Sequence, residues 1–360
     1  MTEECKMSKI IVGLSGGVDS AVTAYLLKLA GHEVIGVTLK TWLSEYGGYS
    51  RCCEIDKSRE LADRLEIPYY VVNCTGEFRQ LITDPFVESY LVGETPNPCV
   101  ICNRRIKWEK MLEAADSLGA DFIATGHYSN IESLPNGRLT VSQSTHTEKD
   151  QSYMLYRLTQ EQLSRTVFPL GKLTKSEVRH IAKQAGLSSA ESPDSQEICF
   201  VTEGNYADFI EEHADRELPP EGNFTDESGS ILGRHRGIHH YTVGQRRGLG
   251  ISLGYRAFVK RIDAGNDRVI LGDEDSLYSR EILCRDTVFM GLPEPGAGEQ
   301  FSALCKVRYH SKAQKAVVEM LDNGRLRITF DEPVRAAAPG QSAVLYDENM
   351  CVLCGGIISG

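Results

Sequence analysis

A glycine-rich turn near the start of the chain has residue types that could bind phosphate. Residues 15–20 read Ser-Gly-Gly-Val-Asp-Ser and separate an apolar run from an amphipathic one. Two glycines let the backbone turn tightly and approach an anion, and the N–H groups of the turn and of a following helix then face the phosphate. Asp19 adds a carboxylate that could hold a magnesium ion bridging phosphate oxygens. The segment lacks both the GK[ST] ending of a Walker loop and the GxGxxG dinucleotide pattern.

Two cysteines are candidates for nucleophilic chemistry. The chain has eleven cysteines behind a polar N-terminus, so we expect free, catalytic or metal-binding thiols and no export signal. Cys102 lies beside three cations, Arg104, Arg105 and Lys107, just ahead of an expected helix. Nearby cations and a helix N-terminus favour the thiolate. Cys199 lies in a polar loop, and for each thiol taken alone a purely structural role remains equally possible.

Charge is unevenly distributed along the chain. The net charge of −11 argues mildly against a general nucleic-acid binder. Two stretches nevertheless contain cations and no acids, which is the pattern of a surface that follows a phosphate backbone, although basic solvated loops would look the same. Their cations are Arg234, Arg236, Arg246, Arg247, Arg256, Lys260 and Arg261 in the first stretch, and Lys306, Arg308, Lys312 and Lys315 in the second.

The elements that position these residues alternate between strand and helix over the first 130 residues. The patterns predict strands at residues 9–14, 33–39, 68–73 and 121–126, and helices at 21–30, 54–65 and 108–118, the last stopped by Gly119. Such alternation predicts a parallel sheet with helices on both faces. Leu39 and Gly126 then fall at the carboxyl ends of strands, where open α/β sheets hold ligands.

The chain changes character beyond residue 205. A capping box from Thr174 to Glu177 predicts one more helix, which ends at Gly186. Short β-rich runs and turn dipeptides follow, with a hairpin signal at Asn323-Gly324. The predicted fold is therefore α/β, with a parallel-sheet domain at residues 1–205, a small connecting domain at 206–272 and a β-barrel-like domain at 273–360.

The ordered motifs resemble a known family. Residues 15–20 resemble the loop of the PP-loop ATP pyrophosphatases. NPxxxCNxxIK, TGHY, KDQSYML, DSQEICF, GxHxGxxxYTVGQRRGLGI, RYH and PGQSAVLYD follow in order. Together they resemble the MnmA family of tRNA-specific 2-thiouridylases over essentially the whole chain.

The resemblance implies an activity and a set of site residues. It implies that the C2 oxygen of the wobble uridine (position 34) of tRNA is adenylated by ATP with Mg²⁺. A sulfur-donor protein then loads a persulfide onto Cys199, and Cys102 is the second catalytic thiol, able to form a Cys102–Cys199 disulfide. The implied ATP-binding residues are Gly13, Leu14, Ser15, Gly16, Gly17, Val18, Asp19, Ser20, Leu39 and Gly126. The implied tRNA-binding residues are Asn97, Pro98, Cys99, His127, Lys149, Asp150, Gln151, Arg308, Tyr309 and Gln341.

One position departs from the family pattern. Members often have aspartate where this chain has Cys99, so a carboxylate is lost and a Cys99-x-x-Cys102 pair is created. Three interpretations stay open: a harmless replacement, a thiol that takes over proton transfer, or an iron–sulfur cluster held by Cys99, Cys102 and Cys199. Apart from that cluster, the sequence predicts no metal site.

Two competing functions remain at this stage. One is a PP-loop ligase or amidotransferase, which needs neither paired cysteines nor a basic second half. The other is a tRNA- or metal-binding protein that has lost catalysis, against which the intact residues 15–20, Cys102 and Cys199 weigh. No apolar run has membrane-spanning length, so we expect a cytoplasmic protein without a membrane partner.

Overall fold

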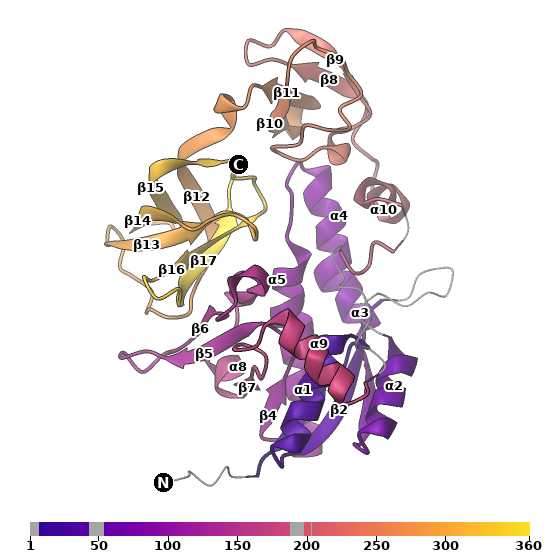
Figure 1. Cartoon of the computed structure of the whole chain (residues 1–360). Coiled ribbons are helices and arrows are strands. Elements are labelled where there is room, and N and C mark those ends of the chain that lie inside the picture. Colours follow the sequence, from indigo (N-terminus) through magenta and orange to yellow (C-terminus); the bar gives the residue numbers. More distant parts are fainter. Residues whose placement is uncertain (1–6, 43–53, 188–197, 203) are drawn as a thin grey trace. The chain divides into compact units, whose positions relative to one another are not determined.

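The computed structural model describes residues 7–42, 54–187, 198–202 and 204–360. It divides into two compact units, and each is described by itself below. The first comprises residues 1–82 and 99–202, and the second comprises residues 83–98 and 203–360. Figure 1 shows the elements of both units coloured along the chain.

A five-stranded parallel sheet organises the first unit. Its order is β3-β2-β1-β4-β7, and every neighbouring pair is parallel, as the alternation of strand and helix predicts. The strands are β1 (Lys9–Gly13), β2 (Glu33–Lys40), β3 (Tyr69–Asn73), β4 (Phe122–Ala124) and β7 (Thr166–Val167). The chain moves from β1 outward to β3 and then returns to β4 on the other side of β1. The sheet therefore has its switch point between β1 and β4.

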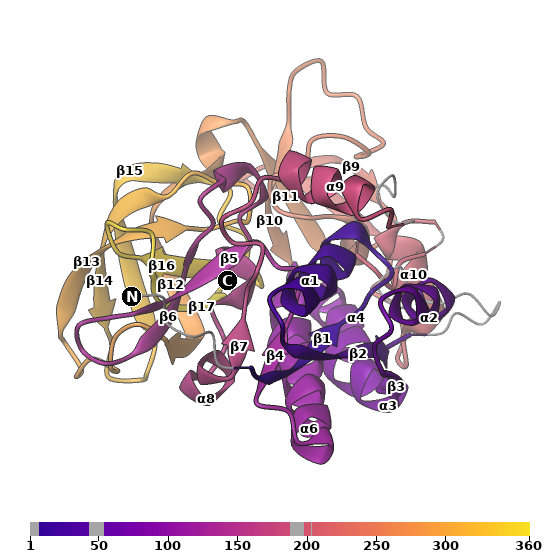
Figure 2. The same cartoon turned by 60° about the horizontal axis from the view of Figure 1, so that its bottom comes forward.

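Helices cover both faces of this sheet (Figure 2). Ile10, Val12 and Leu14 share a buried core with helices on one face. These helices are α1 (Val18–Leu29), α2 (Ile55–Arg64) and α9 (Lys175–Gln184). Alternate strand residues point to opposite faces, and a Cβ on Gly13 would lie 3.0 Å from Met111 Sδ of α6 (Glu109–Leu118). The second face is therefore covered by α6.

Local sequence signals set the helix ends. Thr174 accepts a hydrogen bond from the Glu177 N–H while the Glu177 carboxylate accepts one from the Thr174 N–H, so the predicted capping box of α9 is confirmed. Gly186, just past the end of α9, has φ 63°. Gly119 ends α6 with φ 65°, a left-handed conformation that favours glycine.

The helix that carries Cys102 differs from the prediction. The pattern places its start near Trp108, but the helical stretch begins at Pro98, with α5 (Pro98–Cys102) and a π-helical segment η2 (Asn103–Trp108) before α6. Proline suits a first helical position because it has no N–H to leave unpaired. Cys102 consequently lies inside the helical stretch and not ahead of it.

Short elements complete the first unit. The helical ones are α3 (Thr75–Phe78), the π-helical η1 (Arg79–Thr83), η3 (Thr147–Lys149), α7 (Ser152–Leu155) and α8 (Gln160–Ser164). A separate antiparallel hairpin pairs β5 (Ser129–Ser133) with β6 (Leu139–Gln143).

The second unit begins with two helices and a small sheet. The helices α4 (Asp84–Leu91) and α10 (Tyr206–His213) pack through aromatic side chains, including Tyr90 stacked on Tyr206 at 4.8 Å. The sheet has the order β10-β11-β8-β9. Its strands are β8 (Gly222–Thr225), β9 (Ile231–His235), β10 (Phe258–Asp263) and β11 (Arg268–Gly272), joined by the 3₁₀ turns η5 (Ile238–His240) and η6 (Ala264–Asn266).

A closed six-stranded barrel ends the chain, which confirms the predicted β-barrel. Its strands follow the 3₁₀ turn η7 (Asp275–Leu277) and are β12 (Tyr278–Phe289), β13 (Gln300–Lys306), β14 (Gln314–Met320), β15 (Leu326–Arg335), β16 (Ser342–Tyr346) and β17 (Val352–Ile358). Pairing of β12 with β17 closes it in the order β12-β15-β14-β13-β16-β17. The hairpin predicted at Asn323-Gly324 joins β14 to β15. No helix within the described ranges has the length and apolar character to cross a membrane.

Candidate active site

The glycine-rich turn at residues 15–20 (the phosphate turn) connects β1 to α1 as predicted, and hydroxyl groups hold it closed. The Ser20 hydroxyl donates to the Gly17 carbonyl at 3.0 Å and accepts from the Ser15 N–H at 3.2 Å. Gly16 has φ 82°, and a Cβ there would lie 2.6 Å from the Glu54 Cβ. The sharp turn therefore requires glycine, and it places the first N–H groups of α1 at the carboxyl edge of the sheet.

Gly126 packs directly on this turn. A Cβ at position 126 would lie 2.8 Å from the Asp19 carbonyl carbon and 2.9 Å from the Ser20 nitrogen. The structure thus brings together residues that are more than a hundred positions apart and that both belong to the predicted ATP-binding set. Leu39, near the end of β2, is half-buried at the same edge of the sheet.

Two residues that the sequence analysis did not select engage Asp19. The Lys175 ammonium donates to both carboxylate oxygens of Asp19, at 2.7 and 2.8 Å, and the Tyr128 hydroxyl donates to one of them at 2.7 Å. Tyr128 belongs to the TGHY motif, and Lys175 follows the capping threonine of α9. The motif was a signal for Tyr128, whereas only the fold reveals Lys175.

Cys199 is held at the carboxyl edge by its neighbour. Phe200 is buried and contacts the rings of Trp42 and Phe78, with centroid distances of 6.4 and 5.8 Å. Trp42 follows the end of β2, and Phe78 lies in α3 after the end of β3. The half-buried Cys199 therefore lies beyond the carboxyl ends of β2 and β3, at the edge of the sheet where the phosphate turn follows β1. The preceding residues of its motif, 194–197, lie outside the described residues.

Cys102 reaches the same carboxyl edge through the helical stretch that packs on the opposite face of the sheet. Met111, in the first turn of α6, lies against Gly13 at the end of β1, whereas Asp121, just after α6, exchanges hydrogen bonds with Lys9 at the start of β1. The helix therefore runs antiparallel to β1, and Cys102 precedes it beyond the carboxyl edge. Cys102 is 7% exposed, and no disulfide joins it to Cys199.

Cations surround this helical stretch. The pKa of Arg104 is lowered, first by burial and then by the charges of Arg157 and Arg105. Such a cluster of like charges is stabilised by an anion, so it supports the predicted electropositive setting of Cys102.

His127 does not add to this positive charge. Burial and the charge of the nearby Lys107 hold its pKa well below the usual value. His127 is therefore a neutral side chain at pH 7, and it accepts or donates one hydrogen bond with Thr125 at 2.8 Å.

The other predicted tRNA contacts of the first unit have internal partners. Asp150 is 4% exposed, and its carboxylate accepts from the Ser144 and Ser152 N–H groups and from the Ser152 hydroxyl. The Gln151 side chain accepts from the Tyr128 N–H at 3.0 Å. Gln151 therefore braces the TGHY segment, and Asp150 holds the backbone at Ser144 and Ser152. Lys149 is half-buried, and Cys99 is exposed.

The predicted tRNA contacts of the second unit fall into two groups. Gln341 donates to the carbonyls of Thr95 and Pro96, so it lies beside the segment that contains Asn97 and Pro98. Arg308 donates to the carbonyls of Ala336 and Val243, at 2.9 and 2.8 Å. Tyr309 is half-buried and packs edge-on against His310.

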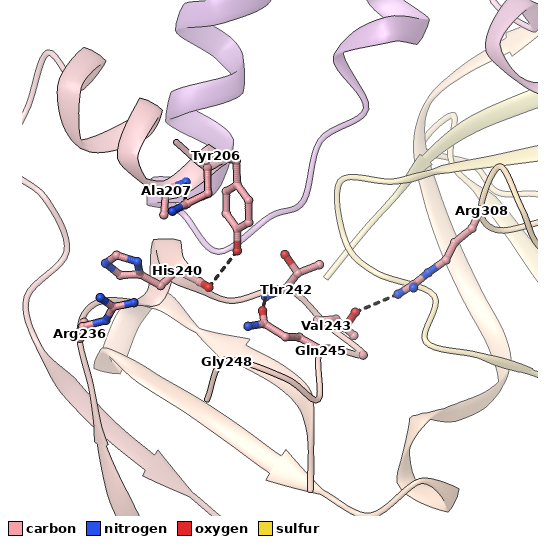
Figure 3. A pocket seen from close by; sticks show the side chains of 11 residues that line it. Tyr206, Ala207, Arg236, His240, Thr242, Val243, Gln245, Gly248 and Arg308 are labelled. Carbon is pink, nitrogen blue, oxygen red and sulfur yellow. Dashed lines mark hydrogen bonds between the residues drawn. The ribbon is translucent and has the colours of Figure 1, made fainter. Parts of the chain in front are cut away.

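A pocket of about 430 Å³ opens within the second unit (Figure 3). Arg236 and His240 lie at one end and Arg308 at the other, and the Tyr206 hydroxyl donates to the His240 carbonyl. The remaining lining residues are Asn205, Ala207, Thr242, Val243, Gly244, Gln245 and Gly248. Both basic stretches thus contribute an arginine to one polar cavity. Elsewhere in the first stretch, Arg234 and Lys260 pair with Glu221 and Glu227.

The three thiols proposed as cluster ligands are not close enough to one another to bind a single metal ion. Within the described ranges, the side-chain group whose ligating atoms all lie within 4.8 Å of one another consists of Glu211, His239 and His240. Cys99, Cys102 and Cys199 do not form such a group. The three sulfur atoms therefore do not share a site for a single metal ion.

The parallel sheet with its phosphate turn defines the class of protein to which the first unit belongs. Three family models match the chain, one after another along the sequence. The model described as "tRNA methyl transferase HUP domain" matches residues 8–203. The "tRNA methyl transferase PRC-barrel domain" matches residues 207–273, and the "Aminomethyltransferase beta-barrel domain" matches residues 279–358. The parallel-sheet unit is therefore a HUP domain, followed by a PRC-barrel domain and a β-barrel domain.

Full-length relatives identify the family. The tRNA-specific 2-thiouridylase MnmA of Lachnoclostridium phytofermentans is 46% identical over 359 residues, which cover 98% of this chain and 100% of the relative. The protein of the same name from Acetivibrio thermocellus is 47% identical, over 97% of this chain and 99% of the relative. The chain belongs to the tRNA-specific 2-thiouridylase MnmA family, as the ordered motifs predict. The solved U34-tRNA thiolase NcsA from Methanococcus maripaludis covers 53% of this chain and 60% of its own at 22% identity, with a TM-score of 0.36, and supports no further conclusion.

Proposed function

We propose that this chain uses ATP to replace the C2 oxygen of the wobble uridine of tRNA with sulfur. The observation that carries the proposal is that the phosphate turn and two cysteines reach the same edge of the sheet. The phosphate turn follows β1, Cys199 is anchored beyond β2 and β3, and Cys102 precedes α6. The relatives that share the whole chain are named for this activity. A ligase or a binding protein would need neither thiol at this edge.

The phosphate turn fits a nucleotide. Gly16 provides the left-handed turn, and Gly126 leaves no room for a side chain against Asp19 and Ser20, so backbone N–H groups are available to an anion. Gly13, Leu14, Ser15, Gly17, Val18 and Leu39 complete the proposed ATP-binding set. A bound Mg²⁺ would neutralise phosphate charge. Asp19 is the residue to hold it, and doing so requires exchange of its present partner, Lys175.

The proposed reaction has two stages. The C2 oxygen of the uridine forms a bond to the α-phosphorus of ATP, and pyrophosphate leaves. The terminal sulfur of a Cys199 persulfide forms a bond to C2, and AMP leaves with the original oxygen. Attack of the Cys102 thiolate on Cys199 Sγ breaks the S–S bond, releases the thiolated base and leaves a Cys102–Cys199 disulfide. A thiol reductant must supply two electrons to restore both thiols.

The partners follow from this chemistry. A persulfide-carrying protein, such as a cysteine desulfurase or a relay protein, must reload Cys199. The tRNA is proposed to contact Arg308, Tyr309, Gln341, Asn97 and Pro98 in the second unit, whose pocket offers Arg236 and Arg308 to phosphates. In the first unit the proposed contacts are Cys99, His127, Lys149, Asp150 and Gln151. Internal bonds of Asp150 and Gln151 make these two positioning residues in our proposal. We place the reaction in the cytoplasm.

A thiolation assay tests the proposal. Unmodified tRNA is incubated with ATP, Mg²⁺ and a persulfide donor, and its nucleosides are analysed by mass spectrometry. Cys199→Ala and Cys102→Ala should abolish 2-thiouridine formation with nearly unchanged tRNA binding, whereas the matched control Cys351→Ala, in the second unit, should keep activity. Thiolation by Cys199→Ala would remove this residue from the mechanism. Iron and sulfide analysis of anaerobically purified protein tests the cluster route in parallel.

Binding of tRNA should depend steeply on salt. Each neutralised phosphate contributes a slope of about −0.9 in a plot of log K against log salt for a duplex. A flat plot would contradict binding by the basic stretches. Arg236→Ala should lower the slope by about one, and Arg234→Ala, whose guanidinium already pairs with Glu221, should lower it less.

A further inference from the structure

Three side chains of the second unit converge although the family resemblance gives none of them a role. They are Glu211 on α10 and two adjacent histidines, His239 and His240, in the 3₁₀ turn η5. Their ligating atoms all lie within 4.8 Å of one another. The Glu211 Oε1 atom is 3.6 Å from His239 Nε2 and 3.1 Å from His240 Nε2.

Of these three side chains, His239 is the most buried. It is 2% exposed, and neither ring nitrogen has a hydrogen-bond partner among the residues that the structure describes. A buried imidazole without partners loses its hydration with no compensation, so such a group calls for an explanation such as a bound water or ion. Its 3.6 Å separation from Glu211 is too long for a hydrogen bond but not for two ligands of one ion.

A glycine, Gly237, leaves the space that the His239 ring needs. Gly237 has φ 125°, and a Cβ there would lie 2.6 Å from the His239 Cε1 atom and 2.9 Å from its Nδ1 atom. A side chain at position 237 would therefore displace the His239 ring from its present position. The Tyr206 hydroxyl, also from α10, donates to the His240 carbonyl at 2.8 Å and fixes the turn against the helix.

We infer that Glu211, His239 and His240 form a binding site for a divalent transition-metal cation of the zinc class. Bonds of about 2.0–2.1 Å in a tetrahedral site separate neighbouring ligand atoms by about 3.3 Å, and the two measured separations bracket this value. Two imidazoles and a carboxylate suit zinc, cobalt or nickel better than magnesium or calcium. Three protein ligands leave one position for water, so we expect exchangeable binding.

The surrounding charges are compatible with this site. Burial lowers the pKa of both His239 and His240, which keeps the imidazoles in the neutral form that binds metal. Asp208, one turn before Glu211 on α10, adds negative charge near His240, and Arg236 opposes it with positive charge. The ion would link α10 to η5. Since His240 also lines the pocket of Figure 3, the ion would fix one wall of that pocket.

The test uses the full chain, treated with a chelator and kept reduced, and titrated with Zn²⁺ or Co²⁺ alone. The variants are Glu211→Gln and His240→Gln. The matched controls are Glu212→Gln, the neighbouring acid on α10, and His180→Gln, an exposed histidine of α9. Calorimetry counts the equivalents of Zn²⁺. The Co²⁺ absorption spectrum separates nitrogen and oxygen ligation from ligation by the chain's eleven cysteines, which gives thiolate charge-transfer bands.

We expect the wild type and both controls to bind one equivalent more than the variants, or to bind it at least about 10-fold more tightly. That equivalent should lack thiolate bands and should raise the unfolding midpoint only where the site is intact. Equal binding by all five proteins, or an equivalent with thiolate bands only, would overturn the inference. Circular dichroism checks folding. If His240→Gln fails to fold, Glu211→Gln decides, because its side chain is 44% exposed.

Discussion

Gly126→Ala should weaken ATP binding although it adds only one methyl group. The added Cβ would lie 2.8–2.9 Å from backbone atoms of Asp19 and Ser20, whereas ordinary contacts of a Cβ begin near 3.4 Å. Gly126 itself does not have a positive φ, so alanine is acceptable to its own backbone. The strain must therefore fall on the phosphate turn, which has to recede by about 0.5 Å because packed interiors barely compress.

The expected size of the effect follows from overpacking. Extra methyl groups in packed sites cost about 1–3 kcal/mol, so if the turn bears the whole strain, ATP affinity falls by about 5- to 150-fold. Calorimetry with a non-hydrolysable ATP analogue measures the dissociation constant, and denaturant unfolding measures stability in the same samples. The matched control is Gly76→Ala in α3, where a Cβ would meet nothing within 4 Å. Alanine is also the better helix former there, so we expect no loss.

Two results would refute this reasoning. If Gly126→Ala binds ATP and unfolds as the wild type does, the close approach to the turn has no energetic consequence. If the variant loses stability but keeps its affinity, the strain relaxes away from the turn, and residues 15–20 do not hold the nucleotide in the proposed way. Because Gly76→Ala lies in the same unit, it controls for a general effect of glycine replacement.

Three further predictions concern the same two units. Lys175→Met should weaken ATP binding by about 10-fold or more at low Mg²⁺ and less at high Mg²⁺, because it leaves the Asp19 carboxylate uncompensated beside phosphate; equal losses at both concentrations would contradict this. Thr174→Ala should lower the free energy of unfolding by about 0.5–2 kcal/mol through loss of the α9 cap, with the exposed Ser117→Ala of α6 as the control. Burial raises the pKa of Cys284 from 9.0 to about 12. Between these pH values the folded chain keeps a proton that the unfolded chain has lost. The free energy of unfolding therefore falls as pH rises, by about 1.4 kcal/mol per pH unit. Cys284→Ala should reduce that slope by the same amount in denaturant unfolding at several pH values, and an unchanged slope would exclude this thiol.

The strand and helix pattern of the first unit was predictable because local signals agree with the packing. The runs at residues 9–14 and 33–39 form the central parallel strands β1 and β2, and glycine ends both α6 and the turn after α9. The predicted start of the α5–α6 stretch was wrong by ten residues. Cys99 to Lys107 carries no apolar stripe of regular helical spacing, because the short helix α5 passes into the π-helical segment η2 there. The membership of residues 83–98 in the second unit also depends on long-range packing, as in the stack of Tyr90 on Tyr206.

The roles of the side chains were harder to predict from the sequence than the positions of the helices and strands. The KDQ motif identifies residues 149–151, but only the fold shows that Asp150 and Gln151 hydrogen-bond to the protein's own backbone. A polar residue in a motif is equally compatible with binding RNA and with bracing a loop, since both uses need the same hydrogen-bonding groups. Arg308 is placed for either use, because its guanidinium donates to two carbonyls and also lines the pocket.

The contacts of Asp19 show why the site needs the whole unit. A carboxylate beside a phosphate turn repels its ligand unless a cation compensates it. Lys175 supplies that charge from a helix 156 positions away in the sequence, and the Tyr128 hydroxyl fixes the same oxygen from the strand end that also contributes Gly126. The Gln151 side chain in turn holds the Tyr128 N–H. The turn, the TGHY segment and the cap of α9 are therefore coupled through one carboxylate. A change at Gln151 should accordingly alter ATP binding without touching the nucleotide, which direct RNA contact by that side chain would not predict.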